Sequence, residues 1–190
     1  SQMFSLEREA QERFPMEKYL GKSYICAGWF PEGATNVDAL VASAYYAADR
    51  RYNIKEIVDH LNNGDIVLLD RYVESNMAHQ GGKLETREAR QKMYEKLDEL
   101  EFGIMELPRP DAVIFLYMPS SYAAILRQGR AEAADQLERD MEHLAKAEQA
   151  YLELTEKYGY IKIDCVKDDV IRTIDDINDE VMDRFEEIIK

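Results

Sequence analysis

Residues 65–72 have the sequence Asp-Ile-Val-Leu-Leu-Asp-Arg-Tyr, an apolar run that ends at an acidic and a basic side chain. The residues Asn62-Asn63-Gly64 before it indicate a turn, so we expect a buried parallel strand over Asp65–Leu69. Ligands of open α/β sheets bind just beyond the carboxyl ends of the strands. Asp70 and Arg71 are therefore expected at a ligand site, and the polar turn of helix after them favours a phosphate group as the ligand.

Apolar runs of the same kind occur at Ala112–Met118 and Tyr160–Cys165, and both predict strands. Amphipathic stretches lie between and around these strands, and we expect helices at Ser1–Glu12, Val37–Asn62, Val73–Gly81, Thr86–Glu106, Ser121–Gln128, Ala131–Tyr158 and Asp168–Ile189. Helices that alternate with apolar strands form right-handed βαβ crossovers and a parallel sheet covered on both faces. We therefore predict an α/β fold with three layers, α/β/α, around a parallel central sheet.

The composition disfavours several classes of protein. The 190 residues have a formal net charge of −14 and a pI near 4.7, which disfavours nucleic acid and anionic membranes as partners. The two cysteines, Cys26 and Cys165, form neither a disulfide framework nor a zinc motif. The longest apolar run is too short to span a bilayer, and the first residues are polar. We expect a cytoplasmic protein in which residues 1–190 form one domain, because no linker divides the chain.

Five motifs follow one another along the chain. They are Arg13-Phe14-Pro15, the helical segment Ala42–Arg50, the run Gly64–Tyr72 with Ser75, Asn76 and Gln80, the segment Leu107–Asp111, and Asp135–Glu138 with Tyr151. In this order they resemble the motifs of the thymidylate kinase family, in the nucleoside-monophosphate kinase group, over nearly the whole chain. The resemblance implies a fold of the P-loop kinase type and Mg²⁺-dependent transfer of the γ-phosphoryl group of ATP to dTMP, which gives dTDP.

The resemblance also assigns roles around the acceptor nucleotide. Arg71 would hold the monophosphate, and Asp70 would orient that arginine or hold water on Mg²⁺. Tyr46 would stack on the thymine ring, and Arg50 would donate to a base carbonyl oxygen. These two residues are four apart on one predicted helix and share a face, and an aromatic ring with a guanidinium suits a flat polar base. Further substrate-binding candidates are Phe14, Tyr72 and Tyr151.

Three polar residues of the short helix Val73–Gly81 complete the predicted nucleoside site. Asn76, His79 and Gln80 are three and four residues apart, so we expect them to line one stripe of this helix. By resemblance Asn76 reads the base edge through its amide, and Gln80 lies near the sugar. His79 stands where many family members carry a tyrosine that crowds the 2′ position of the sugar. This departure leaves the sugar selectivity and the base preference of the chain open.

The segment around residues 120–138 resembles the mobile lid of the family. Phosphoryl transfer depends mainly on alignment of the phosphates and on neutralisation of their charge, and arginines on a closing loop serve both purposes. Arg127 and Arg130 are therefore catalytic candidates, and the alternative is that both are solvated arginines of an acidic helix. Asp135 and Glu138 lie three apart on one predicted helical face and resemble the lid acids that approach Mg²⁺, through water.

The sequence Gly-x-x-x-x-Gly-Lys-[Ser/Thr], which cradles nucleotide phosphates, does not occur in residues 1–190. We expect a P-loop and a first strand upstream of Ser1, because a sheet without its central strand would expose unpaired edges. One alternative is a non-catalytic nucleotide-binding module that lacks the P-loop. Another is a kinase of the same fold for a different deoxynucleotide or deoxynucleoside. The predicted helices Thr86–Glu106 and Asp168–Ile189 carry no recognisable chemistry, and we expect them to cover the sheet or to contribute to a homodimer.

Overall fold

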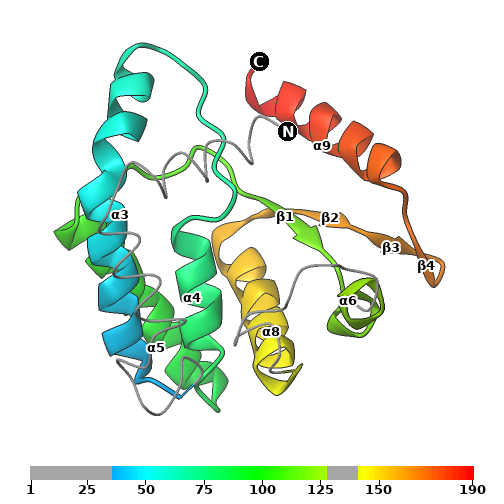
Figure 1. The fold of residues 1–190 in the computed structure, drawn as a ribbon, viewed down its shortest axis with the longest axis horizontal. Helices are drawn as coiled ribbons and strands as arrows, with labels where there is room; N and C mark the ends of the chain where they lie inside the picture. Colours follow the sequence, from blue (N-terminus) through cyan, green and yellow to red (C-terminus); the bar gives the residue numbers. More distant parts are fainter. Residues whose placement is uncertain (1–35, 128–140) are drawn as a thin grey trace.

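The computed structural model describes residues 36–127 and 141–190, and Figure 1 shows how their elements are arranged. Along the chain the elements are α3 (Ala39–Asn62), α4 (Val73–Gly81), α5 (Arg87–Asp98), the π-helix η1 (Glu99–Ile104), β1 (Ile114–Tyr117), α6 (Ser120–Arg127), α8 (Met141–Tyr158), β2 (Ile161–Asp164), β3 (Val166–Lys167), β4 (Val170–Ile171) and α9 (Ile174–Ile188). The predicted helix Ser1–Glu12 and the first part of the predicted helix Ala131–Tyr158 lie outside the described residues.

The two strands β1 and β2 pair in parallel, with Ile114 opposite Ile161. They confirm the strands predicted at Ala112–Met118 and Tyr160–Cys165. Figure 1 shows α8 on one side of these strands and α9 on the other, and α9 contacts β2. Helices on both faces of a parallel strand pair give the three-layer α/β arrangement expected from the sequence.

The predicted strand Asp65–Leu69 is wrong in this structure. The segment is irregular, and within the described residues no strand pairs with it. Ile66 and Leu68 are 63% and 61% exposed. A strand is stable only where a neighbouring strand takes up its backbone N–H and C=O groups, and among the described strands β1 pairs only with β2. An apolar run indicates the tendency to be buried, but it does not supply the partner.

The helix α4 lies at the centre of the helical layer and packs against α3, α5 and α8. Its apolar side contributes Val73 and Met77 to the main core, which also contains Tyr94 of α5 and Leu154 of α8. The approach of α4 to α5 depends on Gly81, because a Cβ atom there would lie 2.3 Å from the ring of Tyr94. The sequence predicts this helix with the bounds that the structure has.

Two other predicted helices differ from the structure. The helix predicted at Thr86–Glu106 widens into η1 after Asp98, and its N-cap, Thr86, accepts a hydrogen bond from the backbone of Ala89. The helix predicted from Asp168 begins only at Ile174, because the residues before it form the β3–β4 hairpin. Asp168 and Asp169 have φ angles of 50° and 61° in its turn, and a two-residue hairpin turn with both central residues left-handed is the type I′ turn.

Candidate active site

Arg71 precedes α4 and has an unusual backbone conformation. Its φ angle is 67°, in the left-handed region that residues other than glycine seldom adopt, and its side chain is exposed. Strained backbone of this kind concentrates at ligand sites, where the rest of the fold holds it in place. Within the described residues no ion pair links Asp70 with Arg71, so the predicted orienting role of Asp70 is not seen here.

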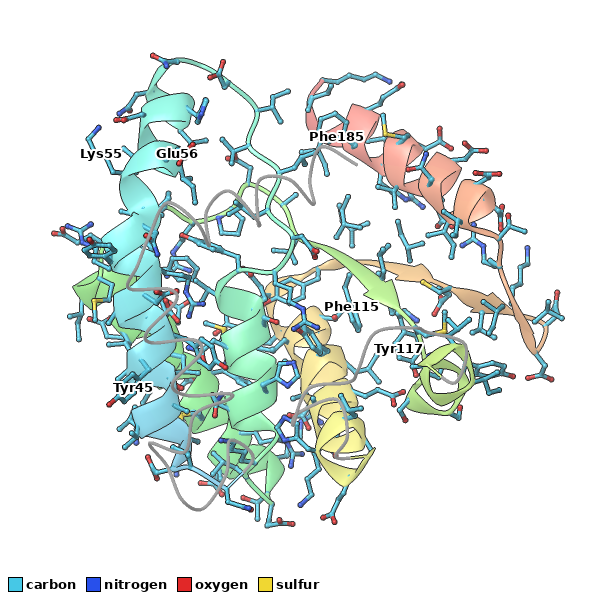
Figure 2. All side chains as sticks on the ribbon, viewed as in Figure 1. Tyr45, Lys55, Glu56, Phe115, Tyr117 and Phe185 are labelled. Carbon is cyan, nitrogen blue, oxygen red and sulfur yellow. The ribbon has the colours of Figure 1, made fainter. Side chains whose placement is uncertain are left out.

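Tyr151 of α8 faces the start of α4 and joins an aromatic group there. Its hydroxyl lies 2.9 Å from Ser75 Oγ, and its ring stacks on Phe115 with the ring centres 5.1 Å apart. Figure 2 shows Phe115 between β1 and α8. Burial raises the pKa of Tyr151, while the hydrogen bond between its hydroxyl and that of Ser75 and the charge of Arg71 act against this rise. Arg71 therefore lies close enough to this aromatic group to influence it electrostatically.

His79 and His143 form a second contact between α4 and α8. His79 Nδ1 lies 3.1 Å from His143 Nε2, and the two rings are nearly parallel, with an angle of 18° between them. The rings of His79 and Tyr151 are nearly perpendicular, with their centres 6.2 Å apart. Burial, then His143 and the charges of Arg71 and Lys83, lower the pKa of His79 to about 3. His79 is therefore neutral at neutral pH, and its ring is held on two sides.

A buried cluster of polar side chains lies where α3, α4 and η1 meet. Arg50 donates from Nε to Glu101 at 2.9 Å and also from Nη2 to the same carboxylate. Asn76 donates from Nδ2 to Glu101 at 2.8 Å. Glu101 is fully buried, and the side chain of Arg50 is only 17% exposed. The structure thus brings together the predicted site residues Arg50 and Asn76, with Glu101 between them.

Glu101 was missed in the sequence, where its helix was expected to carry no chemistry. The available signal is its position four residues after Leu97 and between Leu100 and Phe102, where the helical pattern predicts an apolar residue. A charged residue on a buried face requires a partner, since an unpaired buried charge is strongly destabilising. The partners, Arg50 and Asn76, are distant in the sequence, so the pattern alone could not identify them.

The polar residues predicted to line one stripe of α4 contact different neighbours. Asn76 faces α3 and η1, whereas His79 faces His143 of α8, because other helices cover α4 on both sides. Gln80 is buried, and its Oε1 has no hydrogen-bond partner among the described residues. Asn76 Oδ1 is in the same state. Two buried acceptors one turn apart are thus left unsatisfied by the described residues.

The aromatic candidates near this cluster are partly buried. Tyr46 lies four residues before Arg50 on α3, so both side chains belong to one face of that helix. Figure 2 shows Tyr45 on the outer side of α3, away from α4. Tyr72 donates its hydroxyl to the carbonyl oxygen of Pro108 at 3.1 Å, and burial is the main cause that raises its pKa to about 12.

The remaining site candidates cannot be placed. Phe14, Arg130, Asp135 and Glu138 lie outside the described residues, and Arg127 ends α6 without a described side chain. Among residues 36–127 and 141–190, no three His, Cys, Asp or Glu side chains converge on a possible metal position.

Two surface hollows lie away from these residues. The larger, of about 680 Å³, lies between the start of α3 and α5 and is lined in part by Lys83, Lys92 and Lys96. The smaller, of about 260 Å³, lies beside the last turns of α3. Neither includes Arg71, Asn76 or Tyr151. We place the candidate site around α4, because the buried polar contacts and the strained arginine meet there.

Known proteins similar to this chain are thymidylate kinases. The family model for thymidylate kinase matches residues 32–174. The thymidylate kinase of Limosilactobacillus fermentum is 28% identical over 157 residues, which cover 80% of this chain and 70% of the relative. The probable thymidylate kinase of Pyrobaculum aerophilum is 34% identical over 162 residues, which cover 84% and 76%. The thymidylate kinase of Mycobacterium tuberculosis is 32% identical over 114 residues, which cover 57% and 53%.

The solved structure of thymidylate kinase from Candida albicans has the same fold. It aligns with a TM-score of 0.64 at 23% identity, over 92% of this chain and 75% of that chain. The matches thus span from 53% to 76% of the lengths of the three curated relatives above. Every helix in the described residues is too short or too polar to cross a membrane. Because the family model covers most of the sequence and the fold agrees, this chain belongs to the thymidylate kinase family.

Proposed function

We propose that this protein is a dTMP kinase, which transfers the γ-phosphoryl group of ATP to dTMP and forms dTDP. The observation that carries the proposal is the arrangement around α4. An exposed, conformationally strained arginine, Arg71, stands at its beginning, and the buried Arg50–Glu101–Asn76 cluster lies one turn further along. A guanidinium suits a phosphate and a buried donor–acceptor pair suits a base edge, so one nucleotide can satisfy both.

In this proposal each described side chain has a distinct task. Arg71 binds the acceptor phosphate through its planar fork, and Asp70 lies beside it in the sequence. Arg50 and Asn76 recognise the base, while Tyr46, on the same face of α3 as Arg50, stacks on it. The neutral ring of His79 limits the space near the sugar, and Tyr151 supports that ring from α8. The site candidates Phe14, Tyr72 and Gln80 complete the acceptor site.

The phosphoryl-transfer half of the site is proposed from the sequence alone. Arg127 and Arg130, on the lid around residues 120–138, would neutralise charge on the transferred group and exclude water on closure. Asp135 and Glu138 would approach Mg²⁺ through water. ATP as co-substrate, Mg²⁺, a homodimer, a single domain and a cytoplasmic location belong to the same proposal, and family membership and composition support them.

A second candidate is a kinase of the same fold with another acceptor. The observation that favours it is His79, which stands where many family members carry tyrosine and is held by His143. A coupled assay with ATP and dTMP, dUMP, dGMP or thymidine separates the two candidates. Rapid turnover of another acceptor without turnover of dTMP would replace the first candidate by the second.

The role of Arg71 is tested by the variant Arg71→Ala. We expect kcat/KM for dTMP to fall about 10²–10³-fold, because the phosphate loses its charged partner. The free energy of unfolding should change by less than about 1 kcal/mol, since the side chain is exposed. The matched control is Arg184→Ala, which removes an exposed arginine of α9. Near-normal turnover by Arg71→Ala would remove this residue from the site.

A further inference from the structure

The function proposed above gives Glu101 no task of its own, although this acid lies at the centre of the Arg50–Glu101–Asn76 cluster. Its side chain is fully buried in η1 and accepts hydrogen bonds from both Arg50 and Asn76. Short π-helical segments inside α-helices occur often at functional sites, because they displace a side chain from the regular pattern. The question is what a carboxylate does at this position that an apolar residue would not do.

The contacts of Glu101 determine which way the Asn76 amide points. Asn76 Nδ2 lies 2.8 Å from a Glu101 oxygen and 3.4 Å from the carbonyl oxygen of Ser43. Both neighbours accept hydrogen bonds, so the amide nitrogen must face them and the opposite orientation would set oxygen against oxygen. As a result Asn76 Oδ1 faces away from Glu101, where it is buried and has no partner among the described residues.

The Glu101 carboxylate also orients the guanidinium of Arg50. Two of the guanidinium nitrogens, Nε and Nη2, donate to Glu101, which leaves Nη1 to donate elsewhere. A ligand at this cluster therefore meets a donor from Arg50 and an acceptor from Asn76, both bound to one carboxylate. The complementary edge is a carbonyl oxygen next to a ring N–H, as in thymine and uracil. Cytosine presents the reverse, an amino group next to an unprotonated ring nitrogen.

We propose that Glu101 is a positioning residue that sets the hydrogen-bonding polarity of the base site, and that it thereby selects bases with a carbonyl and N–H edge over cytosine. This inference rests on the proposed function, because it takes the base to lie against Arg50 and Asn76. Guanine has the same carbonyl and N–H pattern as thymine. The exclusion of guanine would therefore depend on the size of the site, and Glu101 would not contribute to that exclusion.

The variant Glu101→Gln tests the proposal. A glutamine amide has a donor as well as an acceptor, so Asn76 becomes free to rotate. We expect the ratio of kcat/KM for dTMP to that for dCMP to fall on the order of 10-fold or more, and the ratio of their dissociation constants to change likewise. The ratio of kcat/KM for dTMP to that for dGMP should stay within about threefold of the wild-type value, since thymine and guanine share the carbonyl and N–H pattern. If Glu101 had a purely structural role, kcat/KM would fall by a similar factor for dTMP, dCMP and dGMP, and that outcome would overturn the proposal.

Two measurements on the wild-type protein keep the test independent of the folding of the variant. By NMR, the two Nδ2 protons of Asn76 should exchange slowly with solvent, because Glu101 and Ser43 hold them. Fast exchange would overturn the orientation that the proposal assigns to this amide. Calorimetry with dTMP, dCMP and dGMP then tests the proposed function and the role of Glu101 separately. Failure to bind any of them contradicts the proposed function, whereas binding of dTMP without preference over dCMP contradicts the role of Glu101.

Discussion

Two buried side-chain oxygens of α4, Asn76 Oδ1 and Gln80 Oε1, lack a hydrogen-bond partner among the described residues. A buried acceptor left unsatisfied costs about 1–3 kcal/mol, so a fold selected for stability alone would place apolar side chains there. Binding sites are where proteins often leave a buried polar group without a partner, and a bound ligand can then supply the missing hydrogen-bond donor. The amide of Asn76 is oriented before a ligand arrives, which lowers the cost of ordering the site on binding.

His79 leads to a prediction about pH. Burial, His143, Arg71 and Lys83 lower its pKa to about 3 in the folded protein, against 6.5 for an ordinary histidine. Between these values the unfolded chain binds a proton that the folded chain refuses, so the stability that the neutral ring provides is lost as the pH falls. The free energy of unfolding of the wild type should fall between about pH 7 and about pH 5. We expect this fall to be smaller in His79→Asn, by up to about 1.4 kcal/mol per pH unit.

Urea denaturation at a series of pH values measures this effect. The matched control is His60→Gln, because His60 is exposed and its hydrogen bond with Asp65 raises its pKa. Stability from His60 is present at low pH and is lost as the pH rises, so its removal must alter the pH slope in the opposite sense. Equal pH slopes for His79→Asn and the wild type would show that the ring of His79 titrates normally.

At the scale of elements, one buried ion pair joins α5 to α8. Arg90 Nη2 lies 2.7 Å from Glu153 Oε1, and Arg90 also donates to the carbonyl oxygens of Leu84 and Glu85. Tyr94 donates to the same carboxylate at 3.2 Å. Burial works to raise the pKa of Glu153, but the hydrogen bond and charge of Arg90 outweigh it and lower the pKa. This pair supports α8, which carries Tyr151 and His143 to the site.

Removal of one partner of this pair should be costly. We expect Glu153→Leu to lower the free energy of unfolding by about 3–5 kcal/mol, because it leaves the guanidinium of Arg90 buried without its counter-ion. The double variant Arg90→Met/Glu153→Leu should recover most of the loss. The control is Lys92→Ala on α5, the helix of Arg90, which breaks an exposed pair with Glu88 and should change the stability by less than about 0.5 kcal/mol. A loss for Glu153→Leu as small as that of the control would contradict the buried pairing.

The helix α4 was predicted with its observed bounds because its signals are local: a turn before it, an apolar period through it and two glycines at its end. Long-range contacts decide the features that were missed. The run Asp65–Leu69 has strand composition without a paired strand among the described residues. The turn at Asp168 and Asp169 lacks the glycine that usually marks a type I′ hairpin. The side-chain hydrogen-bond partners of Glu101 and Arg90 lie 25 or more residues away, and no local sequence pattern indicates them.

At the scale of the whole molecule, the charge opposes the proposed ligand. The chain has 38 acidic and 24 basic residues and a net charge of −14, so a nucleotide approaches against a repulsive field. The candidate site counters this field locally, with Arg71 exposed at the start of α4. Such a field also acts within the protein, since like charges repel one another more strongly in the compact state.

This repulsion predicts how salt affects stability. Raising NaCl from about 10 mM to about 300 mM shortens the screening length from about 30 Å to about 6 Å. We expect the free energy of unfolding at neutral pH to increase on the order of 1 kcal/mol, because salt screens the repulsion among the excess carboxylates. Salt also weakens the ion pairs, but most of these are exposed and contribute little to stability. Urea denaturation measures it, and the same titration near pH 4.7, where the net charge vanishes, is the control. A stability that falls with salt at neutral pH would mean that attractive pairs, and not the net charge, dominate the electrostatics of this fold.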